Sequence, residues 1–238
     1  MHWNKETYQA FLASLLQSAD IPYKQFNDKL LASALPSIGL RLPFLRKTAK
    51  QIGKQHANAF LSVCGTTYHE ERLLYGFVCA TLPYADFLPH SDHFAEHLVE
   101  NWAICDTFCN SIAKTIAPHK QDYFAHIMQY LTSQNPWAVR TGLVIMLSNY
   151  LEQDTISQVL SRTCAITSDF YYVQMAQAWL LATAWAKFPT ETNAHIQQSA
   201  LSIDVLQKFV QKARESKRIS KEDKENLKAF LLHKKQQQ

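Results

Sequence analysis

Three apolar stretches of the sequence contain polar and aromatic residues that are candidates for catalysis or ligand binding. Residues 100–112 (ENWAICDTFCNSI) hold Trp102 and Asp106, an indole one helical turn from a carboxylate. Residues 135–151 (NPWAVRTGLVIMLSNYL) hold Arg140 near their start, and residues 169–185 (DFYYVQMAQAWLLATAW) hold Trp179 in an aromatic stripe. A carboxylate can stabilise developing positive charge, and a guanidinium can bind a phosphate.

The first stretch places its two reactive side chains on one face of a helix. At about 100° per residue, Trp102, Asp106 and Cys109 fall within about 40° of one another, and Ile104 and Phe108 fall roughly opposite. If the Ile104 side faces the core, the indole and the carboxylate are aimed together at the other surface. A partly buried Trp beside a solvated Asp is the alternative.

The second stretch reads as a central helix with a charged start. Asn135 is a suitable N-cap and Pro136 suits the first helical position. Arg140 lies close to that N-terminus, where a cation opposes the helix dipole, so we expect it to have an anionic partner. A salt bridge to a neighbouring carboxylate and a phosphate of a ligand both satisfy this expectation.

These stretches belong to a chain whose composition predicts only helices. The 238 residues include 5 Gly and 8 Pro, and 47% are hydrophobic, so the many short strands of a sandwich or barrel are excluded. Helical periodicity in blocks of about 12 to 20 residues predicts roughly ten to twelve helices. Short joints separate them; at the end of the joint 82–92, Ser91 or Asp92 would cap the helix that follows. Helix pairs of this kind predict a HEAT-like or armadillo-like α-solenoid forming a single domain, 1–238, with a closed bundle as the alternative.

The charge of the chain is concentrated at its C-terminal end. The formal net charge is +4, but residues 208–238 carry ten Lys or Arg against four Asp or Glu, which leaves a net charge of −2 in residues 1–207. A basic helical end suits a polyanion such as nucleic acid, although solvated Lys-rich helix ends are common. No run of about 18 apolar residues is present, so we expect no membrane span and a cytoplasmic location.

Metal and cofactor chemistry find little support in the sequence. His90, His93 and His97 share a helix face and could bind a transition metal, but a solvated histidine cluster is the simpler interpretation. The five cysteines are scattered through apolar segments without a CxxC pair, which predicts reduced, buried thiols. Nucleotide-binding and serine-hydrolase motifs are absent. We therefore expect no metal and no cofactor.

Taken in order, the motifs NWAICD, NPWAVR and YYVQMAQAW resemble the AlkD-type family of DNA alkylation-repair glycosylases, which are built from HEAT-like repeats. GLRLPFLRKTAKQI upstream and FVQKARESKRIS downstream extend the resemblance over about residues 23–232. Asp106 and Arg140 are 34 residues apart, and Arg140 and Trp179 are 39 apart, as in the family's catalytic cleft. The resemblance implies catalytic roles for Trp102, Asp106 and Trp179.

The implied activity is N-glycosylase excision of cationic alkylated purines, such as 3-methyladenine and 7-methylguanine, from double-stranded DNA without base flipping. Arg140 would hold a backbone phosphate, and Arg41, Arg46 and Lys47 would add DNA contacts. No protein partner is implied.

The N-terminal segment leaves an alternative open. Members of the family carry a helix there that packs against DNA near the lesion, and a related branch that lacks this helix has no glycosylase activity. Here only about ten residues, 23–32, precede a joint with Pro and Gly. The alternative is a non-catalytic helical-repeat binding protein that keeps the scaffold.

Overall fold

The structure, a computed structural model, describes residues 2–31, 33–54 and 56–236. Within these ranges the chain is 74% helical and contains no strand, which confirms the predicted all-α, HEAT-like fold class. Contacts between residues divide the chain into two compact units, Met1–His126 and Ile127–Gln238. That the whole of 1–238 acts as one domain stays a prediction.

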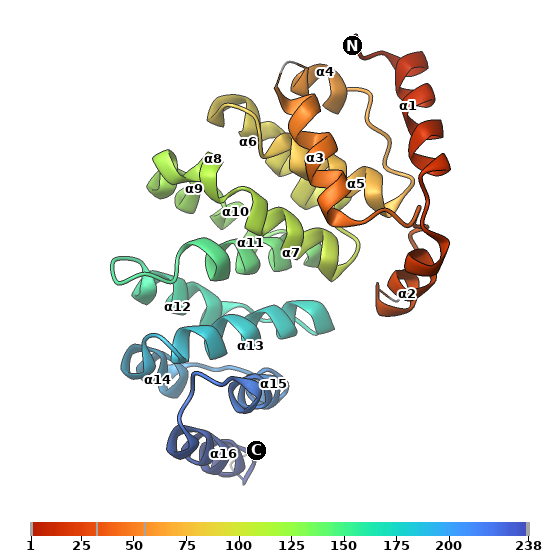
Figure 1. Cartoon of the computed structure of the whole chain (residues 1–238). Coiled ribbons are helices and arrows are strands. Elements are labelled where there is room, and N and C mark those ends of the chain that lie inside the picture. The colour runs from red at the N-terminus through yellow and green to blue at the C-terminus, as the bar shows by residue number, and fades with distance from the viewer. Residues whose placement is uncertain (1, 32, 55, 237–238) are drawn as a thin grey trace. The chain divides into compact units, whose positions relative to one another are not determined.

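The first unit is built around α5. Its helices are α1 (Lys5–Gln17), α2 (Ile21–Leu31), α3 (Leu42–Gly53), α4 (Ala57–Leu61), α5 (His69–Cys79), α6 (Tyr84–His93), α7 (Trp102–Ser111), α8 (Ala113–Ile116) and α9 (Lys120–His126) (Figure 1). A π-helical segment, Phe94–Leu98, follows α6, and a 3-10 turn, Ala117–His119, follows α8. Every residue of α5 is buried, and α3 and α7 both pack against it. A helix buried on all sides is the centre of its unit.

Residues 82–92 are mostly helix, which corrects the predicted joint. Helix α6 runs through Pro89, and Ser91 lies inside it, so neither Ser91 nor Asp92 caps a new helix. The Ser91 side chain is fully buried, and its hydroxyl lies 2.7 Å from the Tyr123 hydroxyl. Phe87 on the same helix is also buried, so the apolar contacts of α6 outweigh the cost of an internal proline.

The second unit repeats the same arrangement of alternate helices. Its helices are α10 (Met128–Leu131), α11 (Pro136–Asn149), α12 (Ile156–Ala165), α13 (Tyr171–Trp185), α14 (Pro189–Gln198), α15 (Ile203–Glu215) and α16 (Lys221–Gln236). Helix α13 packs between α11 and α15, while α12 and α14 pack on each other and on α13 (Figure 1). Alternate helices that share a layer are the signature of HEAT-like repeats.

The described residues form more helical segments than the periodicity predicted. Among the described residues there are sixteen α-helical segments, where the periodicity predicted about ten to twelve helices. Four of them, α4, α8, α9 and α10, have seven residues or fewer, and they lie in regions with too few apolar repeats for a period to be recognised. None of the helices in the described part is long and apolar enough to cross a bilayer.

Candidate functional site

Helix α7 presents Trp102 and Asp106 on the side that faces away from its core contacts. Its N-cap is Asn101, whose side chain accepts a hydrogen bond from the Ile104 backbone N–H at 3.0 Å. Ile104 and Phe108 are buried, as the helical projection predicted, and the Phe108 ring stacks on that of Phe94 with the centroids 4.2 Å apart. Trp102 and Asp106 are both half-buried.

Trp102 and Asp106 line a pocket of about 240 Å³ that we call the α2–α7 pocket. Its lining consists of Tyr23, Phe26, Asn27, Leu30, Leu31, Leu40, Leu42, His69, Leu73, Trp102, Ala103, Asp106 and Thr107. Most of this lining is apolar, and Asp106 supplies the single carboxylate among these residues. A carboxylate beside apolar walls interacts more strongly with a cation than one in open water does.

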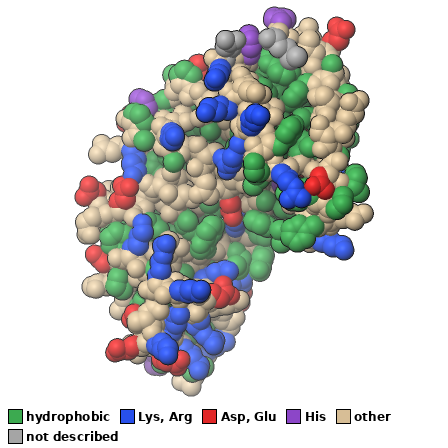
Figure 2. Space-filling view, viewed as in Figure 1, with side chains coloured by type: hydrophobic (Ala, Val, Ile, Leu, Met, Phe, Trp, Pro, Cys, Tyr) green, Lys and Arg blue, Asp and Glu red, His purple; other side chains and the backbone are tan. Residues whose placement is uncertain are grey.

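Helix α2 forms the wall of the pocket opposite α7. It covers 21–31, close to the expected 23–32, and residue 32 lies outside the described residues. Phe26 and Leu30 line the pocket and yet are 63% and 53% exposed. Figure 2 shows hydrophobic side chains gathered where α2 lies. Large apolar side chains left in water at a pocket rim are typical of a binding surface.

Helix α3 carries a basic face in the same unit. Arg41 is its N-cap, and Arg46 and Lys47 lie in its first half. The helix contains no acidic residue, and all three cations are exposed or half-buried. Figure 2 shows a group of Lys and Arg side chains over the region of α3. This face has the charge that a nucleic-acid backbone requires.

The three cations on this face differ in how far they are already engaged. Arg41 donates to Asp20 at 3.0 Å. Arg46 donates to the Ser111 hydroxyl at 3.3 Å, which ties α3 to the last turn of α7. For Lys47 the described residues offer no ion pair or hydrogen bond, so its ammonium is the most available for a phosphate.

Arg140 is held close to the start of α13. Asn135 caps α11, accepting from the Trp137 N–H at 3.0 Å, and Pro136 occupies the first turn, as predicted. The Arg140 side chain is buried, with 4% exposed, and its Nη1 donates to the Tyr172 backbone carbonyl at 2.9 Å. This contact fixes the guanidinium beside the first turn of α13. Its role in holding a phosphate stays a prediction.

Trp179 lies in a pocket that also contains cations. This Trp179 pocket, of about 410 Å³, is lined by Trp179, Ala182, Thr183, Ala186, Lys212, Glu215, Ser216, Lys217 and Arg218. The indole is half-buried on α13, and the cations come from α15 and the residues after it. An indole flanked by three cations and one carboxylate suits a ligand that combines negative charge with an apolar ring or sugar.

The predicted site residues therefore fall into two groups. Trp102 and Asp106 lie together in the first unit, with the basic face of α3 tied to their helix. Arg140 and Trp179 lie on α11 and α13 of the second unit. Sequence reasoning pointed to the basic C-terminal helices in general, and the structure picks out Lys212, Lys217 and Arg218 as those beside the indole.

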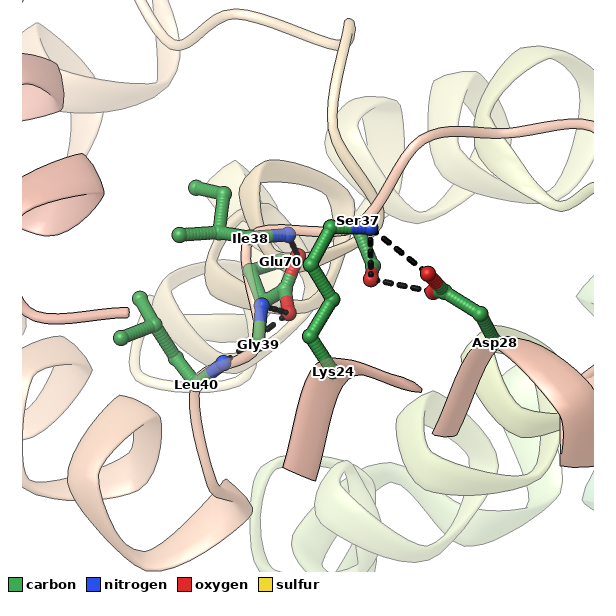
Figure 3. Close-up of polar contacts among 7 residues, drawn as sticks. All are labelled: Lys24, Asp28, Ser37, Ile38, Gly39, Leu40 and Glu70. Carbon is green, nitrogen blue, oxygen red and sulfur yellow. Dashed lines mark hydrogen bonds and ion pairs between the residues drawn. The ribbon is translucent and has the colours of Figure 1, made fainter. Parts of the chain in front are cut away.

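Four further polar residues of the first unit have a structural role that was not predicted from the sequence. The first turn of α5 consists of four consecutive polar residues, and all four are buried. We call them the 69–72 tetrad: His69, Glu70, Glu71 and Arg72. Glu70 accepts three backbone hydrogen bonds from residues 38–40 (Figure 3). The only sequence signal was the string HEER in front of an apolar run, which reads equally well as a solvated helix start.

The histidines and cysteines make different contacts. His90 pairs with Tyr75, the Nδ1 to hydroxyl distance being 2.7 Å, and burial lowers the pKa of His90 and that of His93. Within the described ranges no three His, Cys, Asp or Glu side chains gather in a way that could hold a metal ion.

The cysteines differ in burial: Cys79, Cys105 and Cys109 are buried, whereas Cys64 and Cys164 are half-buried. Burial of Cys109 means that only Trp102 and Asp106 of the projected face are partly open to solvent.

Comparison with known proteins places the chain beside one described family. A family model described as "DNA alkylation repair enzyme" matches residues 11–200, a span that includes Trp102, Asp106, Arg140 and Trp179. A comparison with curated proteins finds no match.

Proposed function

The chain belongs to the DNA alkylation repair enzyme family, and we therefore propose that it is a DNA N-glycosylase for cationic alkylated purines in duplex DNA. A role in DNA alkylation repair, with DNA as a partner, follows from the family itself. The specific lesions that we propose are 3-methyladenine and 7-methylguanine, whose positive charge makes the base a good leaving group.

The observation that carries the proposal is the pairing of Trp102 and Asp106 at the α2–α7 pocket. As the C1′–N bond breaks, its electron pair stays with the base, which leaves neutral, while positive charge develops on the sugar. Asp106 stabilises this charge and orients a water molecule, whose oxygen bonds to C1′ while one of its protons passes to the solvent. The Trp102 ring packs on the deoxyribose and attracts the same cationic character.

Binding to DNA relies on cations in both units. In the first unit Lys47, Arg46 and Arg41 contact backbone phosphates, and in the second Lys212, Lys217 and Arg218 do the same beside Trp179. Such contacts position the duplex without reading its sequence. We assign a further backbone phosphate to Arg140, which is the role that the family resemblance implies for it.

Asp106→Asn tests the proposed chemistry. The substitution keeps the shape and the hydrogen-bonding capacity of the side chain but removes its negative charge. We expect the rate of release of 7-methylguanine from duplex DNA to fall on the order of 10² to 10³-fold, the usual effect of removing a preorganised electrostatic interaction. Asp154→Asn, at an exposed turn of the second unit, is the matched control and should excise like the wild type.

One result would contradict the role of Asp106, and another would favour the alternative function. Equal rates for Asp106→Asn and Asp154→Asn would remove Asp106 from the mechanism. Duplex binding by a wild-type protein that releases no base from any cationic lesion would instead favour the non-catalytic binding protein.

A further inference from the structure

The two walls of the α2–α7 pocket are both attached to the first turn of α5. The 69–72 tetrad is buried, and polar groups are tolerated there only when they are hydrogen-bonded. Each of its members is bonded to a different part of the first unit. The tetrad therefore has the position of a hub between the walls.

Glu70 is bonded to the segment that follows α2. Its carboxylate accepts from the backbone N–H groups of Ile38 at 2.7 Å, Gly39 at 2.7 Å and Leu40 at 3.1 Å (Figure 3). Hydrogen bonds to an ionised acceptor are roughly twice as strong as those between neutral groups. Three of them on one buried carboxylate fix the backbone of residues 38–40 firmly.

Residues 37–39 in turn hold α2. The Gly39 carbonyl accepts from the Asp20 N–H at 3.1 Å, directly before α2 begins. Gly39 has φ +97°, and a Cβ there would lie 2.7 Å from the Lys24 Cβ, so only glycine allows this close approach. Ser37 donates to Asp28, and Lys24 forms a 2.6 Å ion pair with the same carboxylate (Figure 3). Glu70 is thus connected to α2 through a short segment.

The neighbours of Glu70 hold the opposite wall. His69 Nδ1 lies 3.3 Å from the side-chain nitrogen of Asn101, the residue that caps α7. Arg72 donates to the Leu98 carbonyl at 3.0 Å, three residues before that cap. The same helical turn therefore anchors α7 and, with it, Trp102 and Asp106.

We propose that Glu70 is a positioning residue for base excision, because through residues 38–40 it sets the separation between the α2 wall and the Asp106 carboxylate. This inference rests on the proposed glycosylase function. Phe26 and Leu30 on α2 face the same pocket as Asp106, so a shift of α2 displaces a nucleotide packed against them. Small displacements of a reacting group reduce the rate steeply without changing the chemical groups that are present.

Glu70→Gln tests the proposal, and Glu71→Gln is its matched control. Glu71 is equally buried and adjacent in sequence, but it accepts from the Tyr8 hydroxyl and from the Tyr68 N–H at 2.8 Å. It therefore holds α1, no described residue of which lines the α2–α7 pocket. Both variants lose the charge of a buried carboxylate, so a general loss of stability affects both.

Hydrogen–deuterium exchange and the excision rate test the proposal, and DNA affinity is the control measurement. Hydrogen–deuterium exchange should rise in residues 21–31 and 38–40 for Glu70→Gln, and in residues 5–17 for Glu71→Gln. The single-turnover excision rate on saturating duplex should fall on the order of 10- to 100-fold for Glu70→Gln only. DNA affinity should stay within about twofold of wild type in both variants, because phosphate contacts dominate it.

Gly39→Ala should also displace α2, but by changing the segment 38–40 and leaving Glu70 unchanged. Its new methyl group presses on Lys24, so it should raise exchange in α2 and lower the excision rate with Glu70 intact. Faster exchange in α2 with unchanged excision in Glu70→Gln and Gly39→Ala would overturn the positioning role, as would equal losses in Glu70→Gln and Glu71→Gln. If the wild-type protein releases no base, the proposed glycosylase function is wrong. Independently of that result, unchanged hydrogen–deuterium exchange in α2 of Glu70→Gln would show that Glu70 does not hold α2.

Discussion

At the scale of single residues, His69 is a buried histidine whose charge is controlled by its surroundings. Burial lowers the pKa of His69, the carboxylates of Glu70 and Asp28 raise it in part, and Arg72 lowers it further, with a net decrease. The unfolded chain has an ordinary His pKa of about 6.5. Below that pH the unfolded state binds a proton that the folded state does not, so the free energy of unfolding decreases as the pH falls.

His69→Gln should weaken this pH dependence. The glutamine amide can still bond to Asn101 but cannot be protonated, so its variant should lose less thermal stability than wild type between about pH 7.5 and about pH 5.5. Melting temperatures measured by circular dichroism at both pH values check this. His2→Gln, at an exposed position, should behave like wild type. Parallel pH profiles for His69→Gln and wild type would contradict the prediction.

At the scale of elements, the exposed Lys47 of α3 makes no ion pair or hydrogen bond with the residues that the structure describes. Lys47→Ala should weaken binding to damaged and undamaged duplexes about equally, because a phosphate contact carries no sequence information. It should also reduce the slope of log K against log salt by roughly one unit. Fluorescence anisotropy over a range of salt concentrations measures both quantities.

The control for this prediction is Lys5→Ala, another lysine open to solvent, on α1. It should leave the salt slope unchanged. Loss of affinity without any change of slope in Lys47→Ala would mean that Lys47 acts through the fold and not through a phosphate.

Elements also show which parts of the site the sequence could predict. Helix α7 could be predicted because its period alone separates Ile104 and Phe108 from Trp102 and Asp106. The cap at Asn135 was equally local, since its partner lies two residues away. Contacts within one helical turn can be recognised from the sequence because they join residues that are close together in the chain.

The 69–72 tetrad could not be predicted for the opposite reason. Glu70 is stable in the core only because residues 38–40, about thirty positions earlier, supply three N–H groups. Nothing in the letters HEER distinguishes charges paired in this way from charges in water. The joint predicted at 82–92 was wrong for a similar reason, because the buried contacts of Phe87 and Ser91 outweigh the cost of the internal Pro89.

At the scale of the whole molecule, basic charge is strongest where the chain approaches its C-terminal end. Three cations there, Lys212, Lys217 and Arg218, line the Trp179 pocket. Replacing all three with Gln should reduce the salt slope of duplex binding by about two to three units, because each neutralised phosphate contributes roughly 0.9 unit to that slope. Replacing Lys221, Lys228 and Lys235 of α16, which carry the same charge outside that pocket, should have a smaller effect.

A comparable reduction of the slope in both triple variants would indicate a diffuse attraction by net charge. A larger reduction for the pocket variant assigns defined phosphates to the surface around Trp179.

The burial of the cysteine thiols affects how readily this protein is itself alkylated by the methylating agents that produce its proposed substrates. Methylating agents that create cationic purines are electrophiles, and thiolates are among the nucleophiles that they consume. Burial raises the pKa of Cys64 and Cys79, and raises that of Cys164 to about 11, so these groups stay protonated near neutral pH. Cys105 and Cys109 have no surface open to solvent. We therefore expect the folded protein to keep its five thiols unmethylated through a dose that damages DNA, and intact-mass measurement after such a dose should show this.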